Sequence, residues 1–331
     1  MSKPITPVTT FVTHKMPHID EVVAYALLCT YGEKMFPGIK SAKVEFWDAG
    51  NKTPDGRTWQ QWLRDDGYLI VGCGGGCFDE HPTNNTGRKD EHCAATLVAE
   101  YLGVHKKDEL QAILKYALSN DTKGSTNQFD LASLVTLGNM TWFDSDPQGA
   151  FTWATQPVLW HIQKQIKFFT ETRKEFDTYA EVEPVIHNGR EICIVSIESN
   201  DTQIGPYARS IYGASAEVVV QRNAKKQISI TTKQAKMINL DAVMMKLRLA
   251  EMRMNRSKTH LGAADLVREG TAPGSECWYY DRQAMRIFNG SLSAPDVPPT
   301  KIPWKDVVEI IRQTLRDQSP VVKKQKTQHQ Q

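Results

Sequence analysis

The pattern of apolar and polar positions divides the first half of the chain into strands that alternate with helices. Residues 7–13 predict a short strand, and apolar residues at helical spacing predict a helix over residues 20–31. The run at residues 68–71 is apolar throughout, which favours a strand buried on both faces of a parallel sheet. A further strand is predicted at residues 43–47, and further helices at residues 92–102, 107–119 and 127–137. This alternation predicts a parallel α/β domain over residues 1–142.

The second half of the chain has a different pattern. Helical periodicity over residues 147–179 predicts a long connecting helix within residues 143–180. Asn188-Gly189 suits a tight turn with positive φ and predicts a hairpin around it. The remaining predictions are strands at residues 182–186, 192–197, 218–221, 227–231, near Trp278 and at 285–288, and helices at 241–254 and 304–315. Together they predict a smaller α+β domain over residues 181–316, followed by a disordered Lys- and Gln-rich tail at residues 317–331.

Length and charge narrow the classes of partner. A chain of 331 residues suits two domains better than one core. Its 40 Lys plus Arg and 38 Asp plus Glu give a net charge of +2, so affinity for phosphate must be local. Apolar runs long enough for a membrane helix or a secretory signal are missing from the sequence. We therefore expect a cytoplasmic protein without a membrane partner.

The six cysteines, at positions 29, 73, 77, 93, 193 and 277, are scattered along the chain. We expect reduced thiols that pack as small apolar groups. Cys73 and Cys77 flank three glycines, but the three-residue spacing and the lack of a second pair favour thiols over a zinc site.

Histidines and carboxylates gather in the loop after the first predicted strand. His14, His18 and Asp20 would lie where the carboxyl ends of parallel strands open into a crevice. Imidazole and carboxylate ligands suit Mn²⁺ or another transition metal better than Ca²⁺. The alternative is that His14 is a surface residue and Asp20 the N-cap of the next helix. This segment alone does not separate the two interpretations.

Two further segments carry similar residues. The strand at residues 68–71 runs into a glycine cluster, which allows close approach of the backbone to a ligand, and Asp79-Glu80-His81 follows. Asp90-Glu91-His92 comes soon after. Asp121 is predicted in an open polar turn behind a helix that ends near Ser119. For each segment, a solvated turn is the alternative.

In their order over residues 11–125, these motifs resemble the DHH family of phosphoesterases, with its RecJ-like, oligoribonuclease and Myg-type exonuclease branches. The first motif is represented by His14, Pro17, His18 and Asp20, with His18 in place of the first acid. Asp20-Glu21 also resembles the Myg-type form. Asp90-Glu91-His92 is similar to the Asp-His-His signature, and Asp121-Thr122-Lys123-Gly124 to the fourth motif.

The chain departs from the family at two motifs. The second motif ends its strand with a metal-bridging aspartate, whereas this strand reaches Gly72. Asp79 is the nearest acid that could replace it, and Asp48 is a weaker substitute. Glu91 stands where the signature has its first histidine.

The resemblance implies two Mn²⁺ or Mg²⁺ ions that activate a water for phosphodiester hydrolysis. His14, Asp20 and Asp79 would hold one ion. His18, Asp90 and Asp121 would hold the other, and His92 would bind metal or phosphate. His92, Glu91 and Asp121 would be the catalytic residues.

The resemblance also implies an exonuclease or oligonucleotidase. The near-neutral charge favours short single-stranded RNA or DNA over long duplex. In the second domain, Arg268, Arg282 and Arg222 are candidates for phosphate contacts, with surface solvation as the alternative. Two other functions fit the same residues: an inactive metal- or nucleotide-binding module, and a hydrolase of a small phosphorylated metabolite or cyclic dinucleotide. The sequence does not determine whether the chain forms a homodimer.

Overall fold

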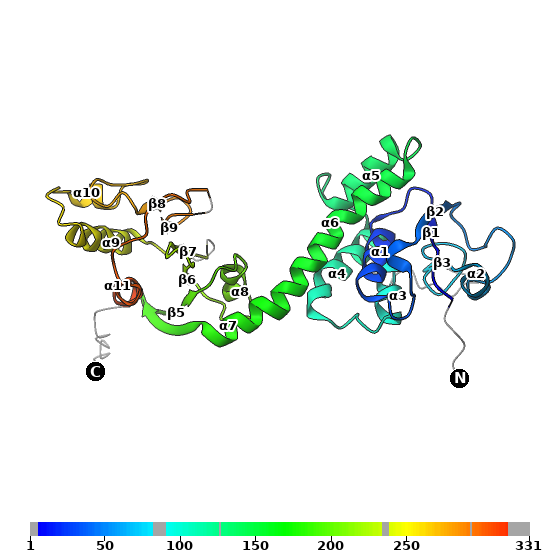
Figure 1. Ribbon diagram of the computed structural model, residues 1–331, viewed down its shortest axis with the longest axis horizontal. Helices are drawn as coiled ribbons and strands as arrows, with labels where there is room; N and C mark the ends of the chain where they lie inside the picture. The colour runs from blue at the N-terminus through cyan, green and yellow to red at the C-terminus, as the bar shows by residue number, and fades with distance from the viewer. Residues whose placement is uncertain (1–5, 82–90, 126, 234–237, 292, 317–331) are drawn as a thin grey trace, which may run out of the picture. The chain divides into compact units, whose positions relative to one another are not determined.

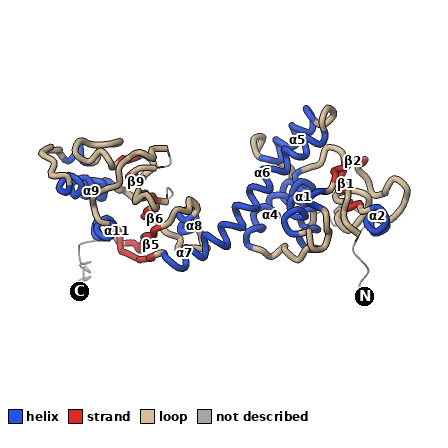
Figure 2. Tube along the Cα trace, viewed as in Figure 1, coloured by secondary structure: helices blue, strands red, loops and turns tan. Residues whose placement is uncertain are grey.

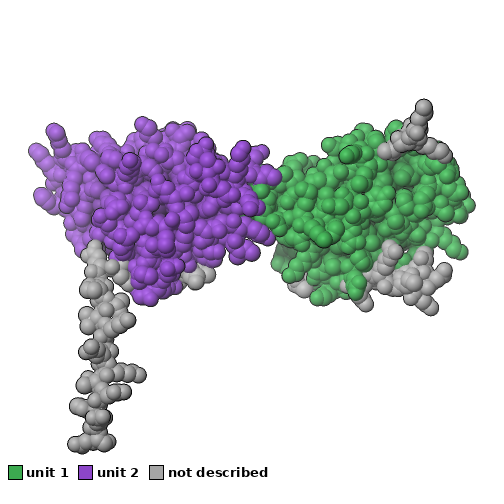
Figure 3. Space-filling view, turned by 90° about the horizontal axis from the view of Figure 1, so that it is seen from below, with its two compact units in different colours: residues 1–169 green, residues 170–331 purple. Residues whose placement is uncertain are grey.

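The computed structural model describes residues 6–81, 91–125, 127–233, 238–291 and 293–316. The predicted tail at residues 317–331 lies outside the described residues, as does Asp90. The chain forms two compact units, Met1–Phe169 and Thr170–Gln331, which Figure 3 colours green and purple. Each unit has its own hydrophobic core.

Unit 1 contains a three-stranded parallel sheet in the order β2-β1-β3. The strands are β1 (Thr10–His14), β2 (Lys43–Trp47) and β3 (Tyr68–Ile70). All five residues of the central strand β1 are buried, because both faces of the strand are covered: Phe11 packs in the main core, and Val12 packs with Ile70 and Cys73 in a second cluster. The prediction of a parallel α/β fold for the first part of the chain is confirmed.

Helix α1 is the centre of unit 1 and packs against α3, α4 and α6 (Figure 1). Its Val and Leu side chains are fully buried, which explains why apolar positions dominate its sequence. The helices are α1 (Ile19–Tyr31), α2 (Trp59–Asp66), α3 (Ala94–Tyr101), α4 (Asp108–Lys123), α5 (Leu131–Trp142) and α6 (Pro147–Lys167), with the 3₁₀ turn η1 (Ile39–Ser41).

Helix α4 extends one turn beyond its predicted end. It continues to Lys123, and Gly124 follows with a φ of +76°. A lysine in the last turn and a glycine behind it are both favourable at a helix C-terminus. The predicted open turn around Asp121 is therefore wrong: Asp121 lies half-buried in the last turn of the helix.

The helical prediction over residues 147–179 is confirmed. Helix α6 begins at Pro147, and Asp146 is its N-cap: the Asp146 carboxylate accepts a hydrogen bond of 2.8 Å from the backbone N of Gly149. The π-helical turn η2 (Phe168–Thr172) and helix α7 (Arg173–Tyr179) continue it.

Unit 2 is built on a six-stranded sheet in the order β4-β5-β6-β7-β9-β8 (Figure 2). Strands β5 and β6 are parallel neighbours, and the other neighbouring pairs of this sheet are antiparallel. Asn188 and Gly189, with φ of +50° and +72°, form the predicted turn between β4 and β5. The strands are β4 (Glu181–His187), β5 (Arg190–Glu198), β6 (Val218–Arg222), β7 (Ile228–Thr232), β8 (Tyr279–Asp281) and β9 (Arg286–Asn289).

Helices α9 and α11 share the core of unit 2 with one face of this sheet. Val218, Val220, Ile228, Ile230 and Ile287 from the strands pack in one cluster with residues of both helices. The helices of unit 2 are α8 (Ile204–Arg209), α9 (Asp241–Met254), α10 (Ala263–Leu266) and α11 (Trp304–Leu315). The predicted α+β architecture of the second half is confirmed.

The sequence predicted reduced cysteines and no membrane-spanning helix. All six cysteines are described, and none forms a disulfide; Cys73 and Cys93 are buried. Within the described ranges, no helix combines the length and apolarity needed to cross a bilayer.

Candidate metal centre

The loop between β1 and α1 brings two histidines together at the carboxyl end of the sheet. His14 is the last residue of β1, and His18 precedes α1. Met16 has a φ of +56°, and the Pro17 carbonyl accepts a hydrogen bond of 2.8 Å from Asn139 Nδ2, which anchors the loop on α5. The ring centroids of His14 and His18 lie 5.1 Å apart.

Glu21 faces this histidine pair from the first turn of α1. Its Oε1 lies 3.1 Å from His14 Nε2, and its Oε2 accepts a hydrogen bond of 2.7 Å from the backbone N of His18. His14 Nδ1 lies 2.7 Å from the Lys15 carbonyl, which can only accept, so Nδ1 carries a proton and Nε2 points to Glu21.

Electrostatics make His14 and Glu21 a buried ion pair. Burial lowers the pKa of His14, but the hydrogen bond and charge of Glu21 outweigh burial and raise this pKa to about 9. Burial raises the pKa of Glu21, but His14 outweighs it and brings that pKa down to about 2. A cation that binds Nε2 must displace the His14 proton.

Three buried carboxylates adjoin this pair. Oxygen atoms of Asp20, Glu21 and Glu80 all lie within 4.8 Å of one another, although the residues are only 0%, 1% and 1% exposed. Burial, together with the neighbouring carboxylates, raises the pKa of Asp20 and brings that of Glu80 to about 7. Asp20 Oδ2 accepts a hydrogen bond of 3.2 Å from Ala94 N, whereas Asp20 Oδ1 and Glu80 Oε2 accept none from the described residues.

The glycine-rich loop after β3 places Glu80 in the cluster, whereas Asp79 forms its hydrogen bonds within the loop. Asp79 Oδ2 accepts a hydrogen bond of 2.8 Å from Gly75 N, and its Oδ1 lies 2.9 Å from His81 Nδ1. Asp79, Glu80 and His81 form a second group of close ligand atoms. Glu80, and not the predicted Asp79, thus meets Asp20 and Glu21 in the buried cluster.

Gly72 follows β3 and makes room for Glu21. Its φ is +72°, and a β-carbon there would lie 2.6 Å from Glu21 Cγ. The carboxylate beside the end of β3 therefore comes from α1. Asp48, the other candidate replacement acid, has an 88% exposed side chain that pairs with Lys15 at 2.7 Å.

A cavity of about 470 Å³ opens beside the cluster. His18 and His81, which belong to the groups of close ligand atoms, line it together with Asp121. The charge of Asp121 contributes to the raised pKa of both Asp20 and Glu80, so Asp121 lies near the buried carboxylates. Polar residues complete the wall: Asn120, Ser125, Ser133 and Thr136.

Other predicted site residues lie apart from these groups. His92 is half-buried, with its Nδ1 3.7 Å from Glu100 Oε1, and Glu91 is exposed. Neither belongs to a group of close ligand atoms within the described residues. In unit 2, Arg268 is exposed, and two arginines are paired with carboxylates: Arg282 with Asp241 and Arg222 with Glu198.

Sequence reasoning left Glu21, Glu80 and His81 out of the predicted ligand set. Glu21 and Glu80 each directly follow a predicted acid, Asp20 and Asp79. That adjacency is a usable signal, because neighbouring residues at a loop or helix start can both reach one site. Which acid of each pair points inward depends on the loop conformation.

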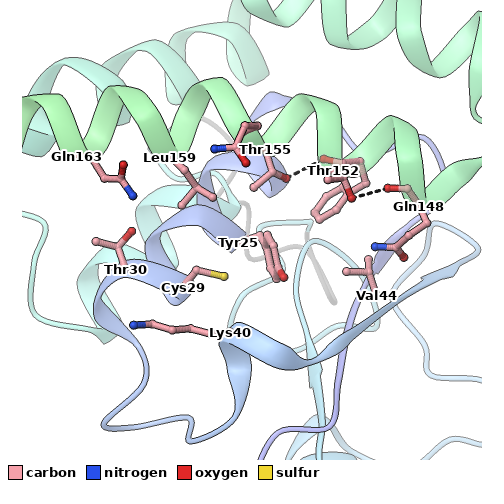
Figure 4. Close-up of a pocket in the computed structure, with 12 residues that line it drawn as sticks. Tyr25, Cys29, Thr30, Lys40, Val44, Gln148, Thr152, Thr155, Leu159 and Gln163 are labelled. Carbon is pink, nitrogen blue, oxygen red and sulfur yellow. Dashed lines mark hydrogen bonds between the residues drawn. The ribbon is translucent and has the colours of Figure 1, made fainter.

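Unit 1 has a second cavity of about 500 Å³ between α1 and α6. Figure 4 shows Tyr25 and Cys29 of α1 facing Thr155 and Leu159 of α6. The hydroxyls of Thr152 and Thr155 donate to helix carbonyls at 2.8 Å, so both are already used within α6. None of its lining residues belongs to the histidine–carboxylate groups.

Comparisons with known proteins do not assign the chain to a family. No protein-family model and no curated protein matches it. Among solved structures, one similar chain is a DHH domain described as a member of a family of ribosomal proteins, at 11% identity and a TM-score of 0.28, over 94% of this chain and 88% of that one. Another is an uncharacterized protein from Helicobacter pylori G27, at 10% identity and a TM-score of 0.23, over 93% and 99%. TM-scores this low do not establish a common fold.

Proposed function

We propose that unit 1 is a divalent-cation-dependent phosphoesterase. The observation that carries this proposal is the buried cluster of Asp20, Glu21 and Glu80, with oxygen atoms within 4.8 Å of one another. Like charges in a buried site oppose ionisation and raise the free energy of the charged state. Bound Mn²⁺ or Mg²⁺ would remove that penalty, and two carboxylate oxygens that accept no hydrogen bond from the described residues can bind it.

The side chains fit such an ion chemically. Two groups of close ligand atoms share Glu21: one adds the imidazoles of His14 and His18, and the other adds the carboxylates of Asp20 and Glu80. Such mixed nitrogen and oxygen ligands suit Mn²⁺. The Lys15 carbonyl fixes the His14 tautomer that directs Nε2 into the cluster. When bound, the cation would lower the pKa of a water and polarise the phosphoryl oxygens.

The cavity beside the cluster gives the substrate a place. His18 and His81 line it, and His81 would offer an imidazole N–H group to phosphate oxygens. The hydroxyls of Ser125 and Ser133 form a polar wall that is held by hydrogen bonds to Asn127, Asp130 and each other. Asp121 would add its carboxylate on the side near Asp20 and Glu80. Together with the resemblance of the motifs to DHH phosphoesterases, the near-neutral charge of the chain supports a short single-stranded oligonucleotide as the substrate.

Hydrolysis assays test this proposal. Labelled short RNA and DNA oligomers and bis-p-nitrophenyl phosphate are incubated with the full chain in Mn²⁺ or in EDTA. We expect turnover in Mn²⁺ that EDTA abolishes and that Glu80→Gln lowers at least about tenfold. Asp48→Asn, a change to an exposed acid in the same unit, should leave turnover unchanged.

The possible results separate the open alternatives. Turnover of bis-p-nitrophenyl phosphate without oligomer hydrolysis would favour a small phosphorylated substrate. Bound Mn²⁺ without any turnover would overturn the enzymatic proposal and favour a binding module. Equal activity of Glu80→Gln and the parent chain would place the chemistry elsewhere.

A further inference from the structure

A separate cavity of about 840 Å³ lies in unit 2, on the sheet face opposite the α9 and α11 core. The pleat of the strands decides this placement. Ile230 and Ile287 point into the core, while the adjacent Ser229, Thr231 and Phe288 line the cavity. The registers Ser229↔Phe288 and Gln221↔Ser229 bring residues of three strands onto one surface.

Arg209 provides a positive charge in this cavity. It is the last residue of α8 and half-buried, and its Nη1 donates a hydrogen bond of 2.7 Å to Thr231 Oγ1. Burial and the charge of Arg286 lower the pKa of its guanidinium, and no carboxylate among the described residues counteracts them. Arg222 and Arg282, in contrast, each have a carboxylate partner.

The rest of the lining matches an anionic ligand. The described lining residues include no Asp or Glu, and they include Lys225 in addition to Arg209. Most are hydroxyl or amide side chains. These are neutral and can hydrogen-bond polar groups of a ligand, and they do not neutralise the charge of Arg209 as a carboxylate would. The hydroxyl and amide members are Ser199, Asn200, Thr202, Gln221, Asn223, Gln227, Ser229, Thr231, Ser291 and Ser293.

Hydrogen bonds to the backbone fix two of these amide side chains, those of Gln221 and Gln227. Gln221 Nε2 donates to the carbonyls of Ser199 and Asp201 at 2.9 and 3.0 Å, and Gln227 Nε2 donates to the Pro295 carbonyl at 3.1 Å. Gly290, with a φ of +77°, leaves the space for Gln227, because a β-carbon there would lie 2.5 Å from Nε2. A fixed polar wall lowers the ordering cost of ligand binding.

We propose that this cavity binds a small phosphate-bearing molecule, with Arg209 as its anion contact. The planar guanidinium matches phosphate oxygens in geometry and charge, and a partly buried cation without a carboxylate gains most from such a partner. The volume falls in the range of small-molecule sites. Phe288, Pro206 and Pro295 add apolar surface for a ring attached to the phosphate. The site needs no divalent cation and is independent of the function proposed for unit 1.

Calorimetric titration of the full chain in EDTA tests this proposal. The probes are inorganic phosphate, ribose 5-phosphate, adenosine 5′-monophosphate and adenosine. We expect at least one phosphate-bearing probe to bind, and Arg209→Gln to weaken its binding at least about tenfold. Arg253→Gln, a change to an exposed arginine of α9, should leave binding unchanged.

The same titrations identify the ligand class. If adenosine 5′-monophosphate binds more tightly than ribose 5-phosphate, the result supports the proposal with a nucleotide as the ligand. If these two probes bind equally, it supports the proposal with a sugar phosphate as the ligand. If Arg209→Gln fails to fold, Arg209→Lys takes its place in the titrations. Arg209→Lys keeps the charge but not the planar guanidinium, so it should retain only part of the affinity. Absence of binding by every phosphate-bearing probe, or equal binding by the parent chain and by either folded Arg209 variant, would overturn the proposal.

Discussion

Glu21 and Gly72 share one space: a β-carbon on Gly72 would lie 2.6 Å from the Cγ of Glu21. This relationship joins the end of β3 to the first turn of α1. It also explains why a glycine at the end of a buried strand is compatible with an acidic site, since the carboxylate at that position is supplied by the neighbouring helix.

Gly72→Ala should destabilise the protein and displace Glu21. Alanine at a positive φ costs on the order of 1 kcal/mol, and the close contact adds a further penalty of about 1 to 3 kcal/mol. Gly103→Ala is the matched control, because Gly103 has a φ of +69° and no atom beyond its own chain neighbours lies within 4 Å of the place a β-carbon would take there. Urea unfolding in EDTA measures both. Equal losses in the two variants would show that Glu21 does not fill the space.

Cation binding should release protons near neutral pH. His14 and Glu80 have pKa values of about 9 and 7, and the pKa of Asp20 is raised, so protons occupy the cluster when the cation does not. The apparent affinity for Mn²⁺ should therefore rise as the pH increases from about 6 to about 9. Titration calorimetry in two buffers of different ionisation enthalpy measures the released protons. Binding that is independent of both pH and buffer would contradict these protonation states.

Arg248 should be a major source of stability in unit 2. It is fully buried, and its guanidinium donates to the carbonyls of Asp265, Leu266, Arg268 and Gly270 at 2.5 to 3.3 Å. Arg248→Met removes these donors and should lower the free energy of unfolding by about 3 kcal/mol or more. Arg253→Met on the same helix is the exposed control. If chemical denaturation finds the two variants equally stable, these hydrogen bonds are not what holds the segment 265–270 on α9.

The fold was largely predictable from local pattern. The buried strand at residues 68–71 and the helix at residues 20–31 have uninterrupted or periodic apolar positions, and Asn188-Gly189 has the backbone freedom that its turn requires. The end of α4 was not predictable in the same way, because Asn120 to Lys123 are polar residues that suit both a turn and a solvated last helical turn. Tertiary packing and Gly124 decide between them.

The candidate site was predictable in its location but not in its membership. His14, His18 and Asp20 lie at the carboxyl end of β1, as the parallel strand pattern predicted. Glu80 required knowledge of the loop, because the hydrogen bonds of Asp79 with Gly75 and His81 decide which acid turns inward. The pairing of Arg282 with Asp241 joins residues 41 positions apart, which local pattern does not reveal.

The measurement that tests the central claim most directly is Mn²⁺ binding by equilibrium dialysis to the parent chain and to Glu21→Gln, Glu80→Gln and Asp48→Asn. Replacing an ionised ligand by an amide should weaken binding at least about tenfold in the first two variants. Asp48→Asn should bind as the parent chain does, because Asp48 is exposed and paired with Lys15. Equal Mn²⁺ binding by all four proteins, or no binding by the parent chain, would contradict a metal centre built on Asp20, Glu21 and Glu80.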